Sequence, residues 1–280
     1  MSNFLKRTLT GTIFVVVMIG GIFWNQYSFE VLFFLIAMLG LDEFYKLLIK
    51  AGYDPHHKLG LLCGATIFFL ITISKLIGES AVLYLSFALI ATIFLTELYR
   101  NKQKPFQNIS YSLLGIIYVV LPFALWVNFT KDYSYQMGGK YNPHLLLGFF
   151  FLLWTNDTGA YIVGMSIGKH KLWERISPKK TWEGFFGGVI LAMGIGYVIS
   201  LFYPELNYML WMIMGLIIGV FGTLGDLVES AFKRSLDVKD SGSILPGHGG
   251  ILDRFDAVLL ATPFVLVLLQ LVMTVQLMTE

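Results

Sequence analysis

The chain has 280 residues, of which 56% are hydrophobic and only 14% charged, with a formal net charge of +2. Its mean hydropathy is +0.70. A soluble domain carries about 25% charged residues, so this chain has too little polar surface to cover a globule in water. The composition excludes an ordinary soluble protein and predicts an integral membrane protein.

Long apolar stretches recur along the whole chain. A helix needs about 20 apolar residues to cross about 30 Å of hydrocarbon. No signal-peptide cleavage site follows the first stretch, so we expect it to be retained as a span. We therefore predict an all-α, polytopic membrane protein of about nine spans, at residues 8–24, 29–49, 59–77, 81–98, 109–129, 144–166, 184–203, 208–230 and 256–278.

The basic residues are distributed unevenly between the two sides of this arrangement. With nine spans and a cytoplasmic N-terminus, only Lys75, Lys131 and Lys140 of the 20 Lys and Arg residues fall on the outer side. Basic residues collect on cytoplasmic loops. We therefore expect the N-terminus in the cytoplasm and the C-terminus outside.

The two halves of the chain differ in kind. Residues 1–140 form about five predicted spans joined by short loops, without a pattern that indicates chemistry. Residues 141–280 hold nearly all the unusual polar groups, at predicted cytoplasmic helix ends and loops, and are the expected catalytic region. We find no convincing internal repeat, which argues against a transporter built from inverted repeats.

The first polar segment of the second half is WTNDTGAYIVG, which places Asn156 and Asp157 inside the sixth predicted span. A carboxylate within the bilayer costs about 2.5–3.5 kcal/mol on insertion scales and is a functional candidate. The alternative is that Asn156 makes a helix-packing hydrogen bond while Asp157 reaches interfacial water.

The second segment, GKHKLWERISPKKTWEG, is a basic cytoplasmic loop. Lys179, Lys180 and Thr181 stand just before the seventh predicted span. Ammonium groups, a hydroxyl and the free N–H groups of a helix start suit a phosphate chain. The alternative is that these lysines only mark a cytoplasmic loop.

The third segment runs from GTLGDLVESAFKR to the start of the last span. Asp226 and Glu229 share a helix face at i,i+3 spacing, and Asp253 and Asp256 repeat that spacing. Carboxylates converging from two helix ends suit Mg²⁺, which is held by one or two carboxylates plus substrate phosphates. Without metal, Asp253 would pair with Arg254 or Lys239, and Asp256 would cap the last helix.

His248 lies between two glycines with no apolar neighbours in sequence, so it is a candidate to donate to a phosphate, to act as acid or base, or to order the turn. Phosphate-binding loops of the G-x-x-x-x-G-K-[ST] and G-x-G-x-x-G types are missing, as is H-E-x-x-H. No serine stands in a recognisable triad pattern. Metal-assisted chemistry on phosphates at the cytoplasmic membrane face remains.

The stretch SAFKRSLDVKDSGSILPGHGGILDRFD, residues 230–256, resembles the signature of the phosphatidate cytidylyltransferase (CDP-diglyceride synthase) family. Upstream, NDTGAYIVG, GKHKL, SPKKTWEG and GDLVES are similar to segments of that family and come in the same order. Residues 1–140 share only hydropathy with it. The matching signature residues are Ser230, Lys233, Arg234, Lys239, Asp240, Gly242, Leu245, Pro246, His248, Gly249, Gly250, Asp253, Arg254 and Asp256.

The resemblance implies that CTP and phosphatidate react to give CDP-diacylglycerol and pyrophosphate. It further implies a homodimer in the bacterial cytoplasmic (inner) membrane, in contact with the lipid bilayer and with its active site facing the cytoplasm. It implies Mg²⁺ held by Asp226 and Asp253, with K⁺ as a candidate second cation. No nucleic-acid partner is expected.

Carried onto this sequence, the resemblance gives two sets of site residues. The expected catalytic set is Asp226, Asp253, His248, Lys239 and Asp256. The expected substrate-phosphate set is Asn156, Asp157, Lys169, Ser177, Lys179, Lys180, Thr181, Lys233, Arg234, Asp240, Gly249, Gly250 and Arg254. The alternatives are an ion-coupled transporter that uses Asp157 and Asp226, and another CTP-dependent lipid enzyme such as a polyprenol kinase.

Overall fold

The computed structural model describes residues 3–136, 138–242, 244 and 249–279. The protein is predominantly helical, as the sequence predicts, with one short two-stranded antiparallel sheet in addition. The chain divides into two compact units, Met1–Tyr141 with Ser235–Arg254, and Asn142–Arg234 with Phe255–Glu280. The polar loop after residue 234 is thus grouped with the N-terminal helices. The predicted functional division between residues 140 and 141 stays a prediction.

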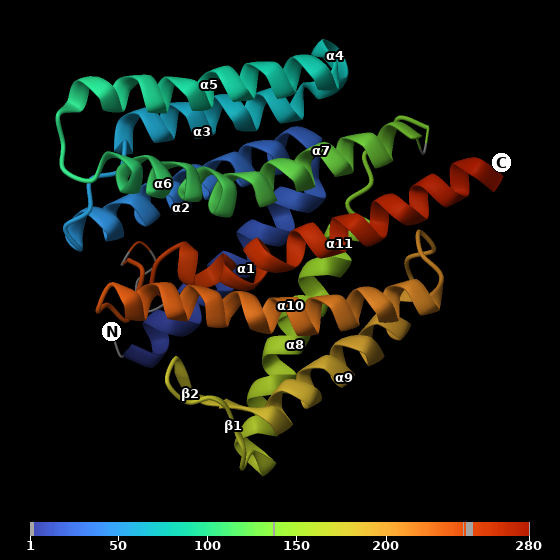
Figure 1. The fold of residues 1–280 in the computed structure, drawn as a ribbon. Helices are drawn as coiled ribbons and strands as arrows, with labels where there is room; N and C mark the ends of the chain where they lie inside the picture. The colour runs from blue at the N-terminus through green and yellow to red at the C-terminus, as the bar shows by residue number, and fades with distance from the viewer. Residues whose placement is uncertain (1–2, 137, 243, 245–248, 280) are drawn as a thin grey trace. The chain divides into compact units, whose positions relative to one another are not determined.

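The first unit is built from helices joined by short turns (Figure 1). A capping box starts the second helix, because Asn25 Oδ1 accepts from Ser28 N at 2.9 Å and Ser28 Oγ accepts from Asn25 N at 3.2 Å. A left-handed Asn101 ends the fifth, and Pro105 starts the sixth. The helices are α1 (Asn3–Trp24), α2 (Gln26–Lys50), α3 (His57–Thr72), α4 (Ser74–Ile77), α5 (Glu79–Arg100), α6 (Pro105–Gly115), the π-helical η1 (Ile116–Val120) and α7 (Leu121–Gln136).

Aromatic side chains fill the core of the first unit. Phe33 packs edge-on against Phe29 and against Phe123, with ring centroids 4.5 and 5.4 Å apart. The buried Tyr45 donates its hydroxyl to the Ser112 carbonyl at 2.6 Å. These contacts join α2 to the long helix formed by α6, η1 and α7, and they hold the end of α2 in a fixed place.

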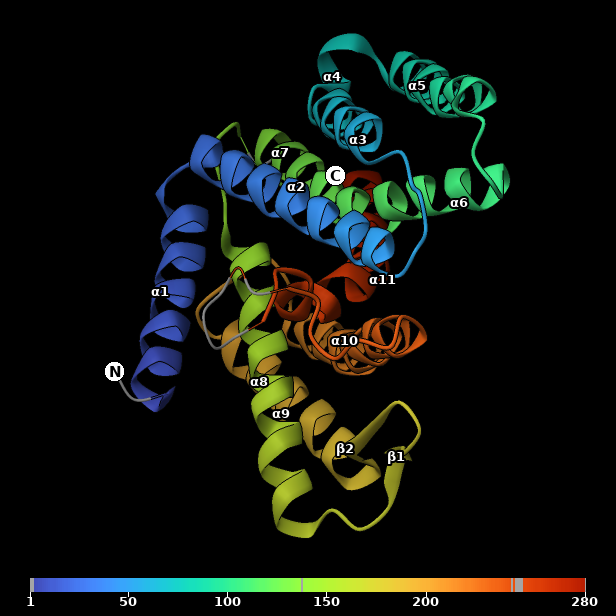
Figure 2. The same ribbon diagram turned by 90° about the vertical axis from the view of Figure 1, so that its left-hand side faces the viewer.

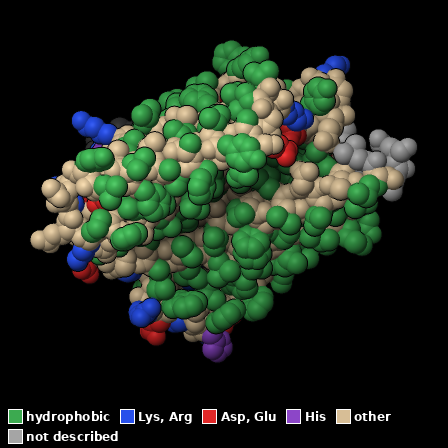
Figure 3. Space-filling model, turned by 45° about the horizontal axis from the view of Figure 1, so that its top comes forward, with side chains coloured by type: hydrophobic (Ala, Val, Ile, Leu, Met, Phe, Trp, Pro, Cys, Tyr) green, Lys and Arg blue, Asp and Glu red, His purple; other side chains and the backbone are tan. Residues whose placement is uncertain are grey.

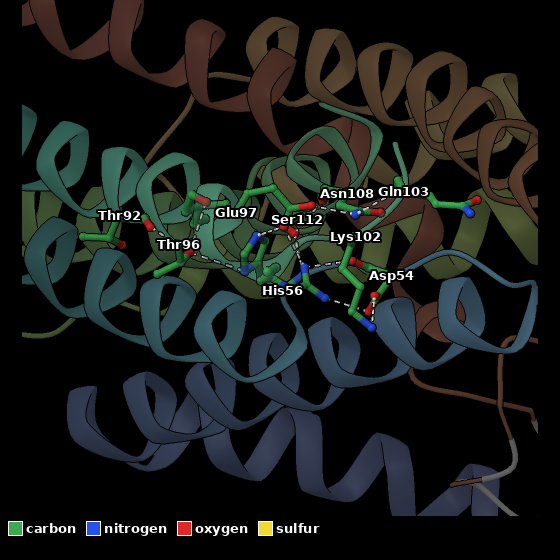
Figure 4. A network of polar contacts seen from close by, with 11 residues as sticks. Asp54, His56, Thr92, Thr96, Glu97, Lys102, Gln103, Asn108 and Ser112 are labelled. Carbon is green, nitrogen blue, oxygen red and sulfur yellow. Dashed lines mark hydrogen bonds and ion pairs between the residues drawn. The ribbon is translucent and has the colours of Figure 1, made fainter. Parts of the chain in front are cut away.

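A polar network closes one end of the first unit (Figure 4). The buried Glu97 of α5 contacts His56 Nε2 at 2.7 Å, Arg100 Nη1 at 2.9 Å and Asn108 Nδ2 at 2.7 Å. Burial and the neighbouring Arg100 lower the pKa of His56 below its ordinary value. The three contacts of Glu97 therefore offset part of the cost of removing its carboxyl group from water.

The second unit contains α8 (His144–Ile167), a hairpin of β1 (Lys171–Trp173) and β2 (Ser177–Thr181), α9 (Trp182–Ser200), most of α10 (Tyr208–Ser235) and most of α11 (Leu252–Thr279). Figure 2 shows the hairpin beside the start of α9. Glycines bring α8 and α9 together: a Cβ on Gly184 would lie 2.7 Å from the Ala160 carbonyl oxygen. Small residues permit such close approach in membrane helices.

Six helices of the described chain are long and apolar enough to cross a bilayer: Glu79–Arg100, Pro105–Gln136, His144–Ile167, Trp182–Ser200, Tyr208–Ser235 and Leu252–Val275. Thr8–Trp24 and His57–Thr72 are shorter apolar helices. The helix α2 is not among the six, and its second half carries Asp42, Glu43 and Lys46. A multi-pass membrane protein is confirmed, while the count of nine spans and the sidedness of the ends stay predictions.

Hydrophobic side chains crowd the surface in view (Figure 3). Along α5 only Ile93 and Glu97 are buried, while Phe87 and Leu98 are 73% and 74% exposed. Soluble monomers rarely expose apolar patches of this extent. Hydrocarbon tails are the environment that suits such a helix.

Candidate active site

A cavity of about 590 Å³ lies in the second unit, between α8, the hairpin, the start of α9 and α10. Its polar wall is formed by Asn156, Asp157, Lys171, Lys179, Lys180, Thr181 and Asp226. Tyr161, Met165, Leu172 and Phe185 form an apolar wall. The cavity therefore offers cations, carboxyl groups and aromatic surface to one ligand.

Lys180 and Asp226 form an ion pair on the cavity wall. Lys180 Nζ lies 2.6 Å from Asp226 Oδ2, and the side chains are 26% and 38% exposed. Ser230, one turn later on α10, donates to Asp226 Oδ1 at 3.2 Å. Because both side chains are partly exposed, a phosphate or a cation can exchange for either partner at modest cost.

The start of α9 is fixed by hydrogen bonds within the protein. Thr181 Oγ1 accepts from Gly184 N at 3.2 Å, and Trp182 N donates to the His170 carbonyl at 2.9 Å. Two of the N–H groups expected to meet phosphate are thus already paired. The lysines of β2, rather than these amides, present the available polar groups to the cavity.

Glu183 organises the basic loop, and the sequence reading missed it. Its carboxyl group accepts from Lys169 N at 3.1 Å and from His170 N at 3.2 Å, and it contacts His170 Nδ1 at 2.6 Å. An acidic residue in the first turn of a helix that follows a threonine cap was the available signal. Lys169 therefore contributes its backbone to the loop's shape, while its predicted substrate contact stays a prediction.

Asn156 is buried, with 2% of its surface exposed. Cβ atoms placed on Gly188 and Gly219 would lie 2.7 and 3.2 Å from Asn156 Oδ1. The side chain therefore packs in the space left by glycines of α9 and α10, but among the described residues its Oδ1 has no hydrogen-bond partner, so the helix-packing hydrogen bond of the alternative is not seen at this atom. The neighbouring Asp157 is exposed on the cavity wall.

Further acidic groups of the second unit lie near the cavity. The buried Glu229 pairs with Lys233 at 2.6 Å, and Asp256 interacts electrostatically with Asp226, Glu229 and Asp157. A Cβ on Gly225 would lie 2.6 Å from the Asp256 carbonyl oxygen, so this glycine lets the backbones of α10 and α11 approach closely. Among the described residues, no three His, Cys, Asp or Glu side chains are arranged to hold a metal ion.

Asp253 belongs to the first unit and is held by the polar loop. Its Oδ2 accepts from Gly250 N at 2.8 Å, from Ser241 N at 3.0 Å and from Ser241 Oγ at 2.9 Å. The helix α11 begins at Leu252, so Asp253 lies in its first turn. The alternative in which Asp256 caps this helix is wrong, because Asp256 comes after the first turn and, among the described residues, its side chain accepts only from the adjacent Ala257 N.

The remaining predicted residues are spread over the loop and its flanks. Ser177 pairs with Trp173 across the hairpin. Gly249 has a left-handed φ of +83°, and Gly250 is buried. His248 lies outside the described residues. Four predicted residues have exposed side chains: Arg234, Lys239, Asp240 and Arg254. The structure thus brings six predicted residues to the cavity and two others, Gly249 and Gly250, next to Asp253. Joint action of Asp226 and Asp253 stays a prediction.

Comparison with known proteins gives a consistent result. The family model for the cytidylyltransferase family matches residues 5–272. A phosphatidate cytidylyltransferase of Staphylococcus epidermidis RP62A is 36% identical over 267 residues, covering 94% of this chain and 98% of the relative. One of Bacillus subtilis 168 is 34% identical over 275 residues, covering 97% and 99%. The chain belongs to the cytidylyltransferase family.

Proposed function

We propose that this protein is a phosphatidate cytidylyltransferase, which converts CTP and phosphatidate into CDP-diacylglycerol and pyrophosphate. The observation that carries the proposal is the cavity that places Lys179, Lys180 and Asp226 beside an aromatic wall. The names of the full-length relatives and the multi-pass membrane architecture support it. A lipid substrate reaches such a protein from the bilayer, and a nucleotide reaches it from water.

In the proposed reaction, a phosphate oxygen of phosphatidate forms a bond to the α-phosphorus of CTP, and the bond to the pyrophosphate oxygen breaks. Pyrophosphate leaves with its electron pair. No covalent bond to the protein is needed, so positioning and charge compensation carry the catalysis. Lys179 and Lys180 supply positive charge at the cavity wall, and Tyr161 and Phe185 offer apolar surface to the cytosine ring.

Magnesium is part of the proposal, with Asp226 and Asp253 as the ligands that the resemblance implies and K⁺ as a second cation. The chemistry of the second unit fits a cation, because Asp226 already binds the Lys180 ammonium and interacts with the carboxyl group of Asp256. When bound, Mg²⁺ would neutralise triphosphate charge. In this proposal the Lys180 ammonium group separates from Asp226 and then binds a phosphate oxygen of the substrate.

The proposal includes a homodimer in a bacterial inner membrane, with the cavity open to the cytoplasm. This sidedness rests on the excess of Lys and Arg on the predicted cytoplasmic loops. A cavity that opens to the cytoplasm also agrees with the proposed reaction, because its substrate CTP is a cytoplasmic metabolite.

The choice of lipid acceptor tests the proposal. Purified protein is given CTP labelled at the α- or γ-phosphate, Mg²⁺, and either phosphatidate or a polyprenol. We expect α-label in a CDP-lipid with phosphatidate alone. Transfer of γ-label to the polyprenol would contradict the proposal and favour a polyprenol kinase. If CTP stays intact with both lipids while liposomes take up cations, an ion-coupled transporter is favoured instead.

A further inference from the structure

Glu43 of α2 is a buried acidic residue in the half of the chain where the sequence indicated no chemistry. It is 4% exposed, and it lies on a helix whose neighbouring residues pack in the aromatic core. Burying a carboxyl group is costly unless hydrogen bonds compensate it. Its partners show what it does.

The Glu43 carboxyl group accepts hydrogen bonds from the backbone at the start of α11. Oε2 accepts from Ile251 N at 2.9 Å, and Oε1 accepts from Leu252 N at 3.2 Å. These amides belong to the start of α11, where helical N–H groups lack partners inside the helix. Glu43 therefore caps α11 from a helix about 200 residues earlier in the chain.

Ser241 connects Glu43 to Asp253. Its hydroxyl contacts Glu43 Oε1, and it lies 2.9 Å from Asp253 Oδ2. A hydroxyl has one proton, so Ser241 donates to one carboxyl group at a time. Asp253 also accepts from Ser241 N and Gly250 N. Neighbouring backbone N–H groups of the same loop therefore donate to Glu43 and to Asp253.

The glycines of the loop fit this arrangement. A Cβ on Gly242 would lie 2.6 Å from Glu43 Oε2, and a Cβ on Gly250 would overlap Glu43 Oε1 and Ser241 Oγ. Gly249 has a left-handed φ, and a Cβ there would overlap Asp253 Oδ2. Gly249 and Gly250 were expected to approach phosphate, but here the missing side chains of the loop glycines make room for two carboxyl groups.

We propose that Glu43 is a positioning residue, which fixes Ser241 and the start of α11 at Ile251 and Leu252, and through them the orientation of the Asp253 carboxyl group. Groups that orient a functional carboxyl through hydrogen bonds commonly change metal affinity or turnover when they are lost. The kinetic part of this inference rests on the proposed function. The structural part, that Glu43 orders this loop, stands by itself.

The test compares Glu43→Gln with two matched variants of the same unit. Gln keeps the size of Glu but presents an N–H₂ group to a site made of donors. Glu97→Gln removes another buried carboxyl group, in the network of Figure 4. Asp42→Asn alters the adjacent residue, whose partly exposed carboxyl pairs with Lys46 at 2.6 Å and with His57 at 2.8 Å, away from the Glu43 contacts.

Two readouts are measured on each full-length protein, hydrogen–deuterium exchange and the Mg²⁺ concentration for half-maximal activity. For Glu43→Gln we expect the amides of Ser241 and of Gly250 to Leu252 to exchange at least about tenfold faster. We expect its half-maximal Mg²⁺ concentration to rise about tenfold. Glu97→Gln should lower the unfolding temperature without either effect, and Asp42→Asn should behave like the wild type.

Unchanged exchange in Glu43→Gln, or equal changes in Glu97→Gln, would overturn the inference. If Glu43→Gln does not fold, Ser241→Ala takes its place, because it breaks the link between the two carboxyl groups. Faster exchange at Gly250 in Ser241→Ala supports the inference, and wild-type exchange contradicts it. A wild-type protein without cytidylyltransferase activity would refute the proposed function alone, since the exchange rates still report on Glu43.

Discussion

In the second unit the Asp226 carboxyl faces an open cavity and pairs with a lysine, whereas in the first unit the Glu43 and Asp253 carboxyl groups accept from the backbone of one loop. The first arrangement can exchange partners, because Lys180 and Asp226 are partly exposed to water. The second is fixed, because each lost donor would leave a buried group unpaired. An enzyme that binds a charged substrate and orients it needs both kinds of site.

The largest expected effect on activity comes from neutralising one proposed metal-binding carboxyl group in each unit. We expect Asp226→Asn and Asp253→Asn each to lower the rate of CDP-diacylglycerol formation by about 10²–10³-fold or more, because both are proposed to stabilise charge in the transition state. The rate is measured on purified, folded protein. Asp42→Asn is the control. Near-normal activity of either variant at ordinary Mg²⁺ would show that its carboxyl group is not a metal ligand.

Lys180→Ala tests whether the exchangeable ion pair on the cavity wall contributes to CTP binding. Without its ammonium, the cavity wall loses positive charge beside Asp226. We expect kcat/KM for CTP to fall about 10- to 100-fold, chiefly through a higher KM. Lys46→Ala, which breaks an exposed pair with Asp42 on the first unit, should leave both constants near the wild type. Equal effects of the two variants would contradict a specific role for Lys180.

Gly250→Ala probes the fixed loop. The added Cβ would overlap Glu43 Oε1 and Ser241 Oγ, and we expect a loss of about 1–3 kcal/mol in the free energy of unfolding, as for other overpacked sites. Gly194→Ala on α9 is the matched control, because nothing lies within 4 Å of a Cβ there. Chemical unfolding in detergent measures both. A Gly250→Ala variant as stable as Gly194→Ala would show that the loop is loosely held.

The smallest expected effect concerns pH and the network of Figure 4. The pKa of His56 in the folded state lies below its ordinary value near 6.5. Folding therefore favours neutral His56, and this contribution to stability is present above pH 6.5 and is lost as pH falls toward the folded-state pKa. Between about pH 7.5 and 5.5, the unfolding temperature should drop more in the wild type than in His56→Gln. An equal drop would exclude His56 as the group responsible.

The local sequence was enough to predict the helices and much of the cavity. Apolar runs of helical length placed the helices, and a charged residue inside such a run made Asp157 conspicuous. The lysines of SPKKT were conspicuous because they precede a helix start. The hairpin that carries them was not predicted, since two strands this short have no clear periodicity.

Glu43 was missed for a physical reason. A single acid near Lys46 and Asp42 at a helix end is ordinary for an interfacial turn, and its partners lie about 200 residues away in the chain. Its importance depends on the loop that folds onto it. Asp256 was assigned to a helix start because the predicted span began there, whereas α11 begins four residues earlier, at Leu252.

Protection of Lys180 by nucleotide tests most directly the claim that the cavity of the second unit receives the triphosphate of CTP. Active wild-type protein is treated with a lysine-reactive reagent with and without CTP and Mg²⁺, and modification is quantified by mass spectrometry. We expect CTP to slow modification of Lys180, while Lys46, whose side chain is 60% exposed, reacts at the same rate in both samples. Equal modification of Lys180 with and without saturating CTP would contradict the account.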